Sequence, residues 1–284
     1  MSPAEALSLS SPSSVATPLG RLHFQQAGAR AQATHVLLHG IGSSAASWAF
    51  QLASAAGRAD LKVLAWDAPG YGQSTHLQAP EPLAADYARE VWAWLDAWGQ
   101  QEPVVLVGHS LGALMAASAT RMAPQRVRRL VLLAPARGYG DAPAAERAQV
   151  LHKRLEGLRQ LGPEGMARAR SAAMLAPGAD PVLVEAVRES MARVDPAGYT
   201  QAAHMLAQGR LQADVALLET ELTVASGERD DITPAAACAG VATAAGRTWV
   251  SLGQVGHACP LEAPDTVNAL LGLPALSAHT QGLA

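Results

Sequence analysis

Hydrophobic residues along the chain fall into short continuous runs that alternate with longer amphipathic stretches. The short runs are rich in Val and Leu, and most are continuous, which is typical of parallel strands buried on both faces. The expected strands are Arg21–Gln26, His35–Leu38, Val63–Trp66, Val104–Val107, Leu130–Leu133, Leu222–Ala225 and Thr248–Leu252. Their alternation with helices predicts an α/β fold, a mostly parallel, doubly wound sheet with right-handed crossovers.

The longer stretches repeat apolar residues every three or four positions, as helices on the surface of a sheet do. Leu83–Trp98 shows this spacing, with Tyr87 and Val91 on one face. A second helix, Leu111–Met122, begins after a turn flanked by glycines and stops before Pro124, which cannot continue it. These helices are expected to connect the parallel strands.

The strand–helix rhythm breaks between about residues 135 and 211. This stretch contains no convincing strand and has four helical patterns. They cover Ala144–Leu161, Gly165–Met174, Pro181–Val194 and Ala197–Gln208. Because a block of this length between two core strands is too long for a loop, it predicts an inserted helical cap.

The two ends of the chain have weaker patterns. Residues 1–17 are rich in Ser and Pro and lack both Lys/Arg and a continuous apolar core. They do not resemble a signal peptide, and they predict a disordered leader. Residues 273–284 are expected to form a frayed tail. The core is then predicted to consist of residues 18–134 and 212–272, with the cap over 135–211.

Composition and charge narrow the class of protein. The 284 residues are 49% hydrophobic with a net charge of −3, and the scattered basic residues exclude a nucleic-acid or anionic-membrane surface. No apolar run approaches the roughly 20 residues of a membrane helix. Cys238 and Cys259 have neither disulfide-framework nor metal-site spacing. We therefore expect a cytoplasmic protein that binds a small-molecule substrate and needs no metal or cofactor; its oligomeric state stays open.

The strongest chemical motif is Gly108-His109-Ser110-Leu111-Gly112, which joins a buried strand directly to a helix. Glycines are expected at both ends because a Cβ there would clash with neighbouring backbone in so tight a turn. The turn exposes the serine hydroxyl at the positive end of the following helix. An ordinary Gly-Ser turn does not need a buried strand directly before it and a helix directly after it, so Ser110 is the predicted nucleophile.

A serine at its own pKa is a poor nucleophile, so it needs a base and an acid that orients the base. Of the nine histidines, His257 follows the last expected strand, at the end of the sheet where ligands bind. The acid should follow a strand between the serine and the histidine, and Asp230 and Asp231 compete there. Asp230 is preferred because it lies three residues after Gly227 and four before Pro234. Asp231 would then be a solvated neighbour or a helix cap.

An attacked carbonyl also needs donors for the developing oxyanion. The backbone N–H of Leu111, next after the nucleophile, is one candidate. The second is expected in the turn His39-Gly40-Ile41-Gly42-Ser43, which opens a helix at Ser44. Ile41 N–H is the candidate there, and a merely flexible glycine turn is the alternative.

The order and spacing of several motifs resemble the α/β-hydrolase superfamily over about residues 18–272. The motifs are His39-Gly40-x-Gly42, Asp67-Ala-Pro-Gly-Tyr-Gly72-Gln-Ser74, Gly108-His-Ser110-Leu-Gly112, Gly227-Glu-x-Asp230 and Gly256-His257. The resemblance implies the α/β-hydrolase fold and a Ser–His–Asp hydrolase. Because residue 110 is serine, the dehalogenase and epoxide hydrolase branches, which use an aspartate nucleophile, are disfavoured.

Within this superfamily the cap is similar to that of 3-oxoadipate enol-lactonases. The similarity lies in 194–202, which follow the helix Val182–Met191. Two features depart from it: Gly112-Ala113 stands where many lactonases have Gly-Gly, and the turn after Asp67 is closer to that of carbon–carbon hydrolases of meta-cleavage products.

Three functions remain in view. The first is hydrolysis of a small carboxylic ester or lactone through an acyl-enzyme, with an enol-lactone of aromatic catabolism as the specific hypothesis. The second is carbon–carbon bond hydrolysis of meta-cleavage products. The third is a non-catalytic binding protein on a hydrolase scaffold. The sequence offers several cap arginines that can pair with a substrate carboxylate and several cap methionines that either line the pocket or pack. They are Arg137, Arg168, Arg170, Arg193, Met166, Met174, Met191 and Met205.

Overall fold

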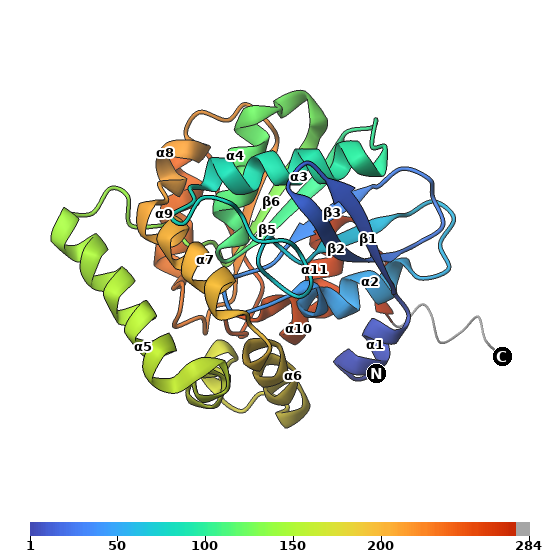
Figure 1. Cartoon of the computed structure of the whole chain (residues 1–284). Coiled ribbons are helices and arrows are strands. Elements are labelled where there is room, and N and C mark those ends of the chain that lie inside the picture. Colours follow the sequence, from blue (N-terminus) through green and yellow to red (C-terminus); the bar gives the residue numbers. More distant parts are fainter. Residues whose placement is uncertain (277–284) are drawn as a thin grey trace.

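The computed structural model describes residues 1–276, in which eight strands form a single sheet (Figure 1). The strands are β1 (Ser11–Thr17), β2 (Gly20–Ala27), β3 (His35–Leu38), β4 (Val63–Trp66), β5 (Val104–His109), β6 (Val127–Leu133), β7 (Leu222–Ser226) and β8 (Trp249–Ser251). Their order is β1-β2-β4-β3-β5-β6-β7-β8. The β1–β2 and β2–β4 pairs are antiparallel and the other pairs are parallel. The predicted mostly parallel α/β fold is confirmed.

Helices connect the strands on both sides of this sheet. The α-helices are α1 (Pro3–Ser8), α2 (Ala49–Ala55), α3 (Ala84–Trp98), α4 (Gly112–Met122), α5 (Ala144–Arg170), α6 (Pro181–Ala192), α7 (Pro196–Gln208), α8 (Leu211–Val215), α9 (Ala235–Ala244), α10 (Cys259–Glu262) and α11 (Pro264–Leu271). The 3-10 helices are η1 (Ala45–Trp48), η2 (Pro124–Arg126) and η3 (Ala172–Met174). The helices expected at 83–98 and 111–122 are therefore α3 and α4.

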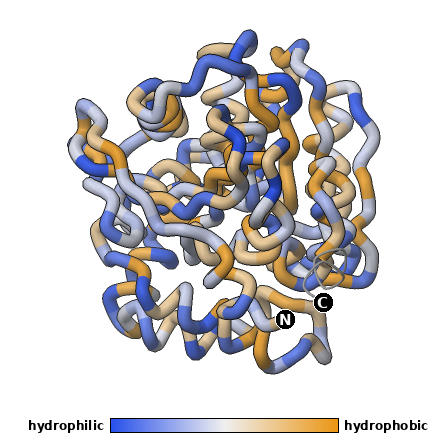
Figure 2. The backbone as a smooth tube through the Cα atoms, turned by 90° about the vertical axis from the view of Figure 1, so that its right-hand side faces the viewer, coloured by the Kyte–Doolittle hydropathy of each residue, from blue (hydrophilic) through white to orange (hydrophobic). Residues whose placement is uncertain are grey.

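Successive side chains of the central strands point to opposite faces of the sheet, as the pleat requires. Leu106 of β5 packs in the core formed with α3, α4, α8 and α9, whereas its neighbours Val105 and Val107 pack in the core formed with α2 and α11. Figure 2 shows the resulting pattern, with hydrophobic segments inside the molecule and hydrophilic residues interspersed along the outer helices. Within the described part of the chain, none of the helices combines the length and the apolar character that a membrane crossing requires.

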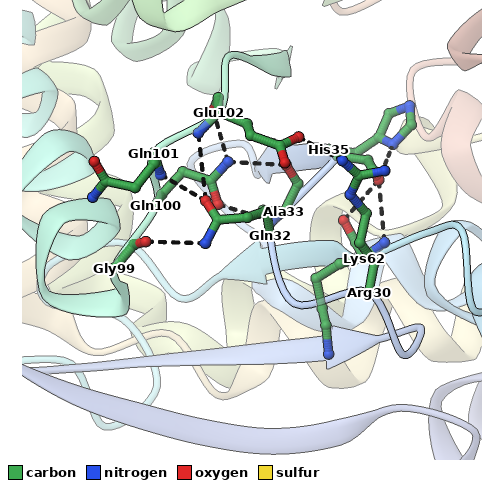
Figure 3. Close-up of polar contacts among 10 residues, drawn as sticks. Arg30, Gln32, Ala33, His35, Lys62, Gly99, Gln100, Gln101 and Glu102 are labelled. Atoms are coloured by element: carbon green, nitrogen blue, oxygen red, sulfur yellow. Dashed lines mark hydrogen bonds and ion pairs between the residues drawn. The ribbon is translucent and has the colours of Figure 1, made fainter.

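A polar network aligns β3 and β5 at the ends where they begin (Figure 3). The Gln100 side chain accepts a hydrogen bond from Ala33 N–H at 2.8 Å and donates to Ala33 O at 3.0 Å. Gln32 Oε1 accepts from Gln101 N–H at 2.6 Å, and Arg30 pairs with Glu102. The strands β3 and β5 lead directly into the two turns predicted to contain the site. The network lies at the other end of both strands and fixes the position of one strand relative to the other.

The helical block between β6 and β7 comprises α5 to α8, with η3 between α5 and α6. Gly162, with φ of 62°, and the following Pro163 break α5 into two helical stretches, in agreement with the expected end of a helix at Leu161. The two ends of the block lie side by side, because Gly140 N–H donates to Gly209 O at 2.8 Å and Leu211 N–H donates to Arg137 O at 3.0 Å.

The prediction of a disordered leader at residues 1–17 is wrong. Ser2 caps α1 in a capping box with Glu5, and β1 extends the sheet by pairing with residues 20–26 of β2. Ala6 is fully buried among residues of α2 and α6, and Figure 1 shows α1 beside these helices. The Ser- and Pro-rich composition masked a strand that is only half buried, in which alternate residues face solvent.

The expected frayed tail, 273–284, is described only as far as residue 276. Leu273 is buried, and Leu276 N–H donates to Asp265 at 2.8 Å, so residues 273–276 pack on the core. Residues 277–284 lie outside the described part of the chain.

Ala6→Asp should detach α1 from the domain, because it buries an unpaired carboxylate at a cost of about 2 kcal/mol or more. We expect amide hydrogen exchange in α1 to accelerate at least tenfold, roughly the factor that this cost implies. Ala4→Asp is the matched control, because Ala4 is exposed on the same helix. Equal exchange in the two variants would contradict the docking of α1.

Candidate active site

Ser110 lies in the tight turn between β5 and α4, with a φ of 52° that non-glycine residues rarely adopt. A Cβ on Gly108 would lie 2.5 Å from Gly112 O, and a Cβ on Gly112 would lie 2.3 Å from Leu38 O. Both distances are far below contact, so the expected requirement for glycine at these two positions is confirmed. The strained turn is typical of residues that a fold holds in place for function.

His257 and Asp230 are brought together in the loops that follow β8 and β7. His257 Nδ1 lies 2.8 Å from Asp230 Oδ2, and the two side chains are 1% and 0% exposed. Burial raises the pKa of Asp230, but the hydrogen bond and charge of His257 and the donors of Thr233 outweigh it, so the pKa is lowered. The carboxylate can therefore stay ionised while it orients the imidazole.

The backbone that follows Asp230 satisfies its remaining lone pairs. Asp230 Oδ1 accepts hydrogen bonds from Ile232 N–H and Thr233 N–H, both at 2.8 Å. Thr233 Oγ1 lies 2.7 Å from Asp230 Oδ2 and 3.1 Å from His257 Nδ1. The adjacent Asp231 is exposed, so the structure places Asp230, and not Asp231, against the histidine.

Ser110 and His257 line the same cavity, whose volume is about 810 Å³. Within residues 1–276 no hydrogen bond joins Ser110 Oγ to the imidazole of His257. Such contacts are often long before a substrate binds and tighten in the reacting complex. The structure thus brings the predicted base and acid into contact and places the predicted nucleophile in the wall of their common cavity.

The predicted oxyanion donors Ile41 and Leu111 also line this cavity. Two side chains hold the turn that contains Ile41. His39 Nε2 accepts from Ala68 N–H at 3.0 Å, so the ring proton is on Nδ1 and is donated to Gly40 O at 2.8 Å. Tyr71 Oη donates to Ile41 O at 2.7 Å. Because Gly40 O and Ile41 N–H belong to one peptide unit, His39 fixes the direction of that N–H.

His109 holds the loop of His257 through a hydrogen bond to its backbone. Its Nε2 donates to His257 O at 2.8 Å, and the two rings lie 5.0 Å apart. Burial, followed by the nearby His257, lowers the pKa of His109 to about 3, so the ring stays neutral. The variable position of the serine motif therefore has a structural role in positioning the predicted base.

Glu262 ties the same loop to the helical block. Its carboxylate accepts from Gly256 N–H and from Ala176 N–H, both at 2.8 Å. Ala258 N–H also donates to Met174 O at 2.7 Å. The loop of His257 is consequently attached to residues 174–176, which precede α6.

The helical block contributes a large part of the cavity wall. Met166, Met174 and Met191 line the cavity, whereas Met205 is fully buried in the core. Of the arginines suggested by the sequence, all except Arg168 line the cavity. A further arginine, Arg154 of α5, lines it as well. Within the described residues, no group of three or more His, Cys, Asp or Glu side chains is arranged to hold a metal ion.

Sequence reasoning missed four residues of the site: Thr233, Tyr71, Glu262 and Arg154. Tyr71 stands inside a recognised motif, and Thr233 and Glu262 follow the ends of two others by three and five residues. The roles of all three depend on which atoms the folded loops bring into contact. Arg154 has a detectable signal, because it lies among Leu151, Leu155 and Leu158 on the side of α5 that packs against the core.

Comparison with known proteins identifies the fold and the family of the chain. Residues 36–270 match the family model described as the alpha/beta hydrolase family. A hydrolase from Pseudomonas aeruginosa PA01 has a TM-score of 0.78 at 27% identity, over 92% of this chain and 98% of that chain. The enol-lactonase from Burkholderia xenovorans LB400 shares the fold, with a TM-score of 0.79 at 22% identity over 92% and 98% of the two chains.

Curated relatives match over part of their length. The dihydrolipoyllysine-residue acetyltransferase component of the acetoin cleaving system of Cupriavidus necator is 30% identical over 88% of this chain, which spans 65% of that protein. The 2-hydroxy-6-oxononadienedioate/2-hydroxy-6-oxononatrienedioate hydrolase of Paraburkholderia phymatum is 35% identical over 40% of this chain and 39% of that protein. The (E)-2-((N-methylformamido)methylene)succinate hydrolase of Acinetobacter baylyi is 31% identical over 62% and 64%.

Asp230→Asn should lower kcat for an activated ester by about 10³-fold or more, because an amide neither holds the reactive imidazole tautomer nor stabilises the imidazolium. Asp231→Asn is the matched control and should stay within about threefold of wild type, as surface substitutions usually do. Steady-state hydrolysis of p-nitrophenyl acetate measures both. A larger loss in the Asp231 variant would transfer the role to that residue.

Proposed function

The chain belongs to the alpha/beta hydrolase family, and from this premise we propose that it is a serine hydrolase that cleaves a small carboxylic ester or lactone through an acyl-enzyme. The observation that carries the proposal is the buried His257–Asp230 pair, at 2.8 Å, beside a cavity whose wall also contains Ser110. A hydrogen-bonded base and acid beside a turn serine that lines the same cavity is the arrangement that activates a hydroxyl for attack.

In the proposed reaction, His257 Nε2 takes the proton of Ser110 Oγ as the oxygen attacks the substrate carbonyl carbon. Ile41 N–H and Leu111 N–H bind the oxyanion of the tetrahedral intermediate, since neither N–H donates elsewhere within residues 1–276. His257 then gives the proton to the leaving alkoxide, and the acyl group stays on Ser110. A water molecule, deprotonated by His257, hydrolyses this ester and restores the serine.

The specific substrate we propose is an enol-lactone of aromatic catabolism, on the resemblance of the cap segment 194–202 to that of 3-oxoadipate enol-lactonases. Carbon–carbon hydrolysis of meta-cleavage products is the second candidate. The local similarity to the Paraburkholderia phymatum hydrolase, at 35% identity, favours it. Side-by-side assays of p-nitrophenyl esters, enol-lactones and meta-cleavage products distinguish the two, because only the second activity cleaves a carbon–carbon bond.

We further propose that residues 135–211 act as a cap that controls water and substrate choice. Met166, Met174 and Met191 line the cavity together with Ser110, and a dry pocket strengthens the oxyanion donors. A fluorophosphonate probe separates an enzyme from a binding protein on the same scaffold. The probe labels an activated serine and leaves a mere binding fold unlabelled.

Ser110→Ala and His257→Ala should each lower kcat by roughly 10³-fold or more, and the double variant should fall little further, because members of a triad act as a unit. Single-turnover and steady-state hydrolysis of p-nitrophenyl butyrate measure the effect. Ser43→Ala is the control, because Ser43 also lines the cavity but lies outside the proposed machinery. Near-wild-type turnover in either single variant would refute the assignment.

A further inference from the structure

The cavity carries more positive than negative side chains. Its charged side chains, apart from histidines, are four arginines, Arg137, Arg154, Arg170 and Arg193, and two acids, Asp67 and Glu189. Glu189 pairs with Arg193 at 3.2 Å, and Asp67 accepts a hydrogen bond from Ala45 N–H at 2.9 Å. The remaining arginines have no ion-pair partner within residues 1–276, so the cavity has uncompensated positive charge.

Among these arginines, Arg154 differs in its surroundings. Arg137 and Arg170 are exposed to solvent, whereas Arg154 is half-buried. Its Nε is buried and has no hydrogen-bond partner within the described residues. A buried guanidinium N–H without a partner is costly, so Arg154 has donor capacity that a ligand in the cavity can satisfy.

The position of Arg154 relates it to the proposed reaction centre. Leu158, one turn further along α5, lines a small neighbouring cavity together with Gly42 of the oxyanion turn. This face of α5 is therefore turned towards Gly42. The positive charge of Arg154 also lowers the pKa of Tyr71, although the larger effect of burial raises the pKa of that phenol overall. Tyr71 is in turn hydrogen-bonded to Ile41 O.

We propose that Arg154 binds a carboxylate of the substrate, so that the cavity selects esters or lactones bearing an anionic group at a distance from the scissile carbonyl. This inference rests on the proposed function. A guanidinium presents a planar fork of donors that matches a carboxylate, and a charge-assisted pair in a partly desolvated site is stronger than a neutral one. Arg154 would act in binding and orientation and would take no part in proton transfer.

The test compares two esters of matched shape, the mono-p-nitrophenyl ester of adipic acid and p-nitrophenyl 6-methylheptanoate, which replaces the carboxylate by an isopropyl group. Wild type should favour the anionic ester in kcat/KM. Arg154→Met should lower the anionic-to-neutral ratio by about tenfold or more, as expected for loss of a hydrogen bond to a charged group, with most of the change in KM. Arg154→Lys should lower it less, because it keeps the charge and loses the fork.

Arg168→Met is the matched control, because Arg168 lies on the same helix, is exposed and does not line the cavity; it should leave the ratio unchanged. Adipate should competitively inhibit hydrolysis of the neutral ester by wild type and inhibit Arg154→Met more weakly.

A wild-type preference for the neutral ester, or an unchanged ratio in Arg154→Met, would overturn the role of Arg154. The first result needs no variant to fold. Absence of Ser110-dependent hydrolysis of both esters would overturn the proposed function instead, so the two failures are distinguishable.

Discussion

The architecture of the site depends on the close approach of the turn after β5 to the end of β3. A Cβ on Gly112 would lie 2.3 Å from Leu38 O, and a Cβ on Gly40 would lie 3.0 Å from Cβ of Ser110. The two turns that contain Ser110, Leu111 and Ile41 are therefore packed backbone to backbone. Any residue larger than glycine at position 112 separates the serine from the turn that contains Ile41, so the distance between the proposed nucleophile and the proposed oxyanion donor is set by van der Waals contact.

The other half of the site is held by hydrogen bonds instead of close packing. The loop of His257 is hydrogen-bonded to His109, to Asp230 and, through Glu262, to the helical block. Two of these bonds connect segments that lie far apart in the sequence, since 148 residues separate His109 from His257 and 86 separate Ala176 from Glu262. The position of the imidazole consequently depends on the core and on the inserted helices together.

Much of this arrangement is predictable from the sequence, because it is dictated by local chemistry. Continuous apolar runs indicated the parallel strands, and the glycines of the serine turn predicted a clash that the structure confirms. The choice of Asp230 over Asp231 follows from spacing, and the geometry agrees with it. Residues 1–17 were misjudged because composition does not reveal that a half-buried edge strand can pair with β2. Periodicity does show that Arg154 shares a helix face with three leucines. It does not show which neighbouring element that face contacts, so the position of Arg154 in the cavity wall could not be predicted.

The adjacent ends of the helical block have a consequence for how such proteins diversify. Gly140 N–H is bonded to Gly209 O, and a Cβ on Gly138 would lie 2.2 Å from the same oxygen. Because the ends of this segment are already in contact, its length does not change the distance that the connection between β6 and β7 has to span. Loop-closure entropy also grows only slowly with length. The narrow junction is thus a natural graft point, at which one set of helices can be exchanged for another while the register of the sheet is preserved.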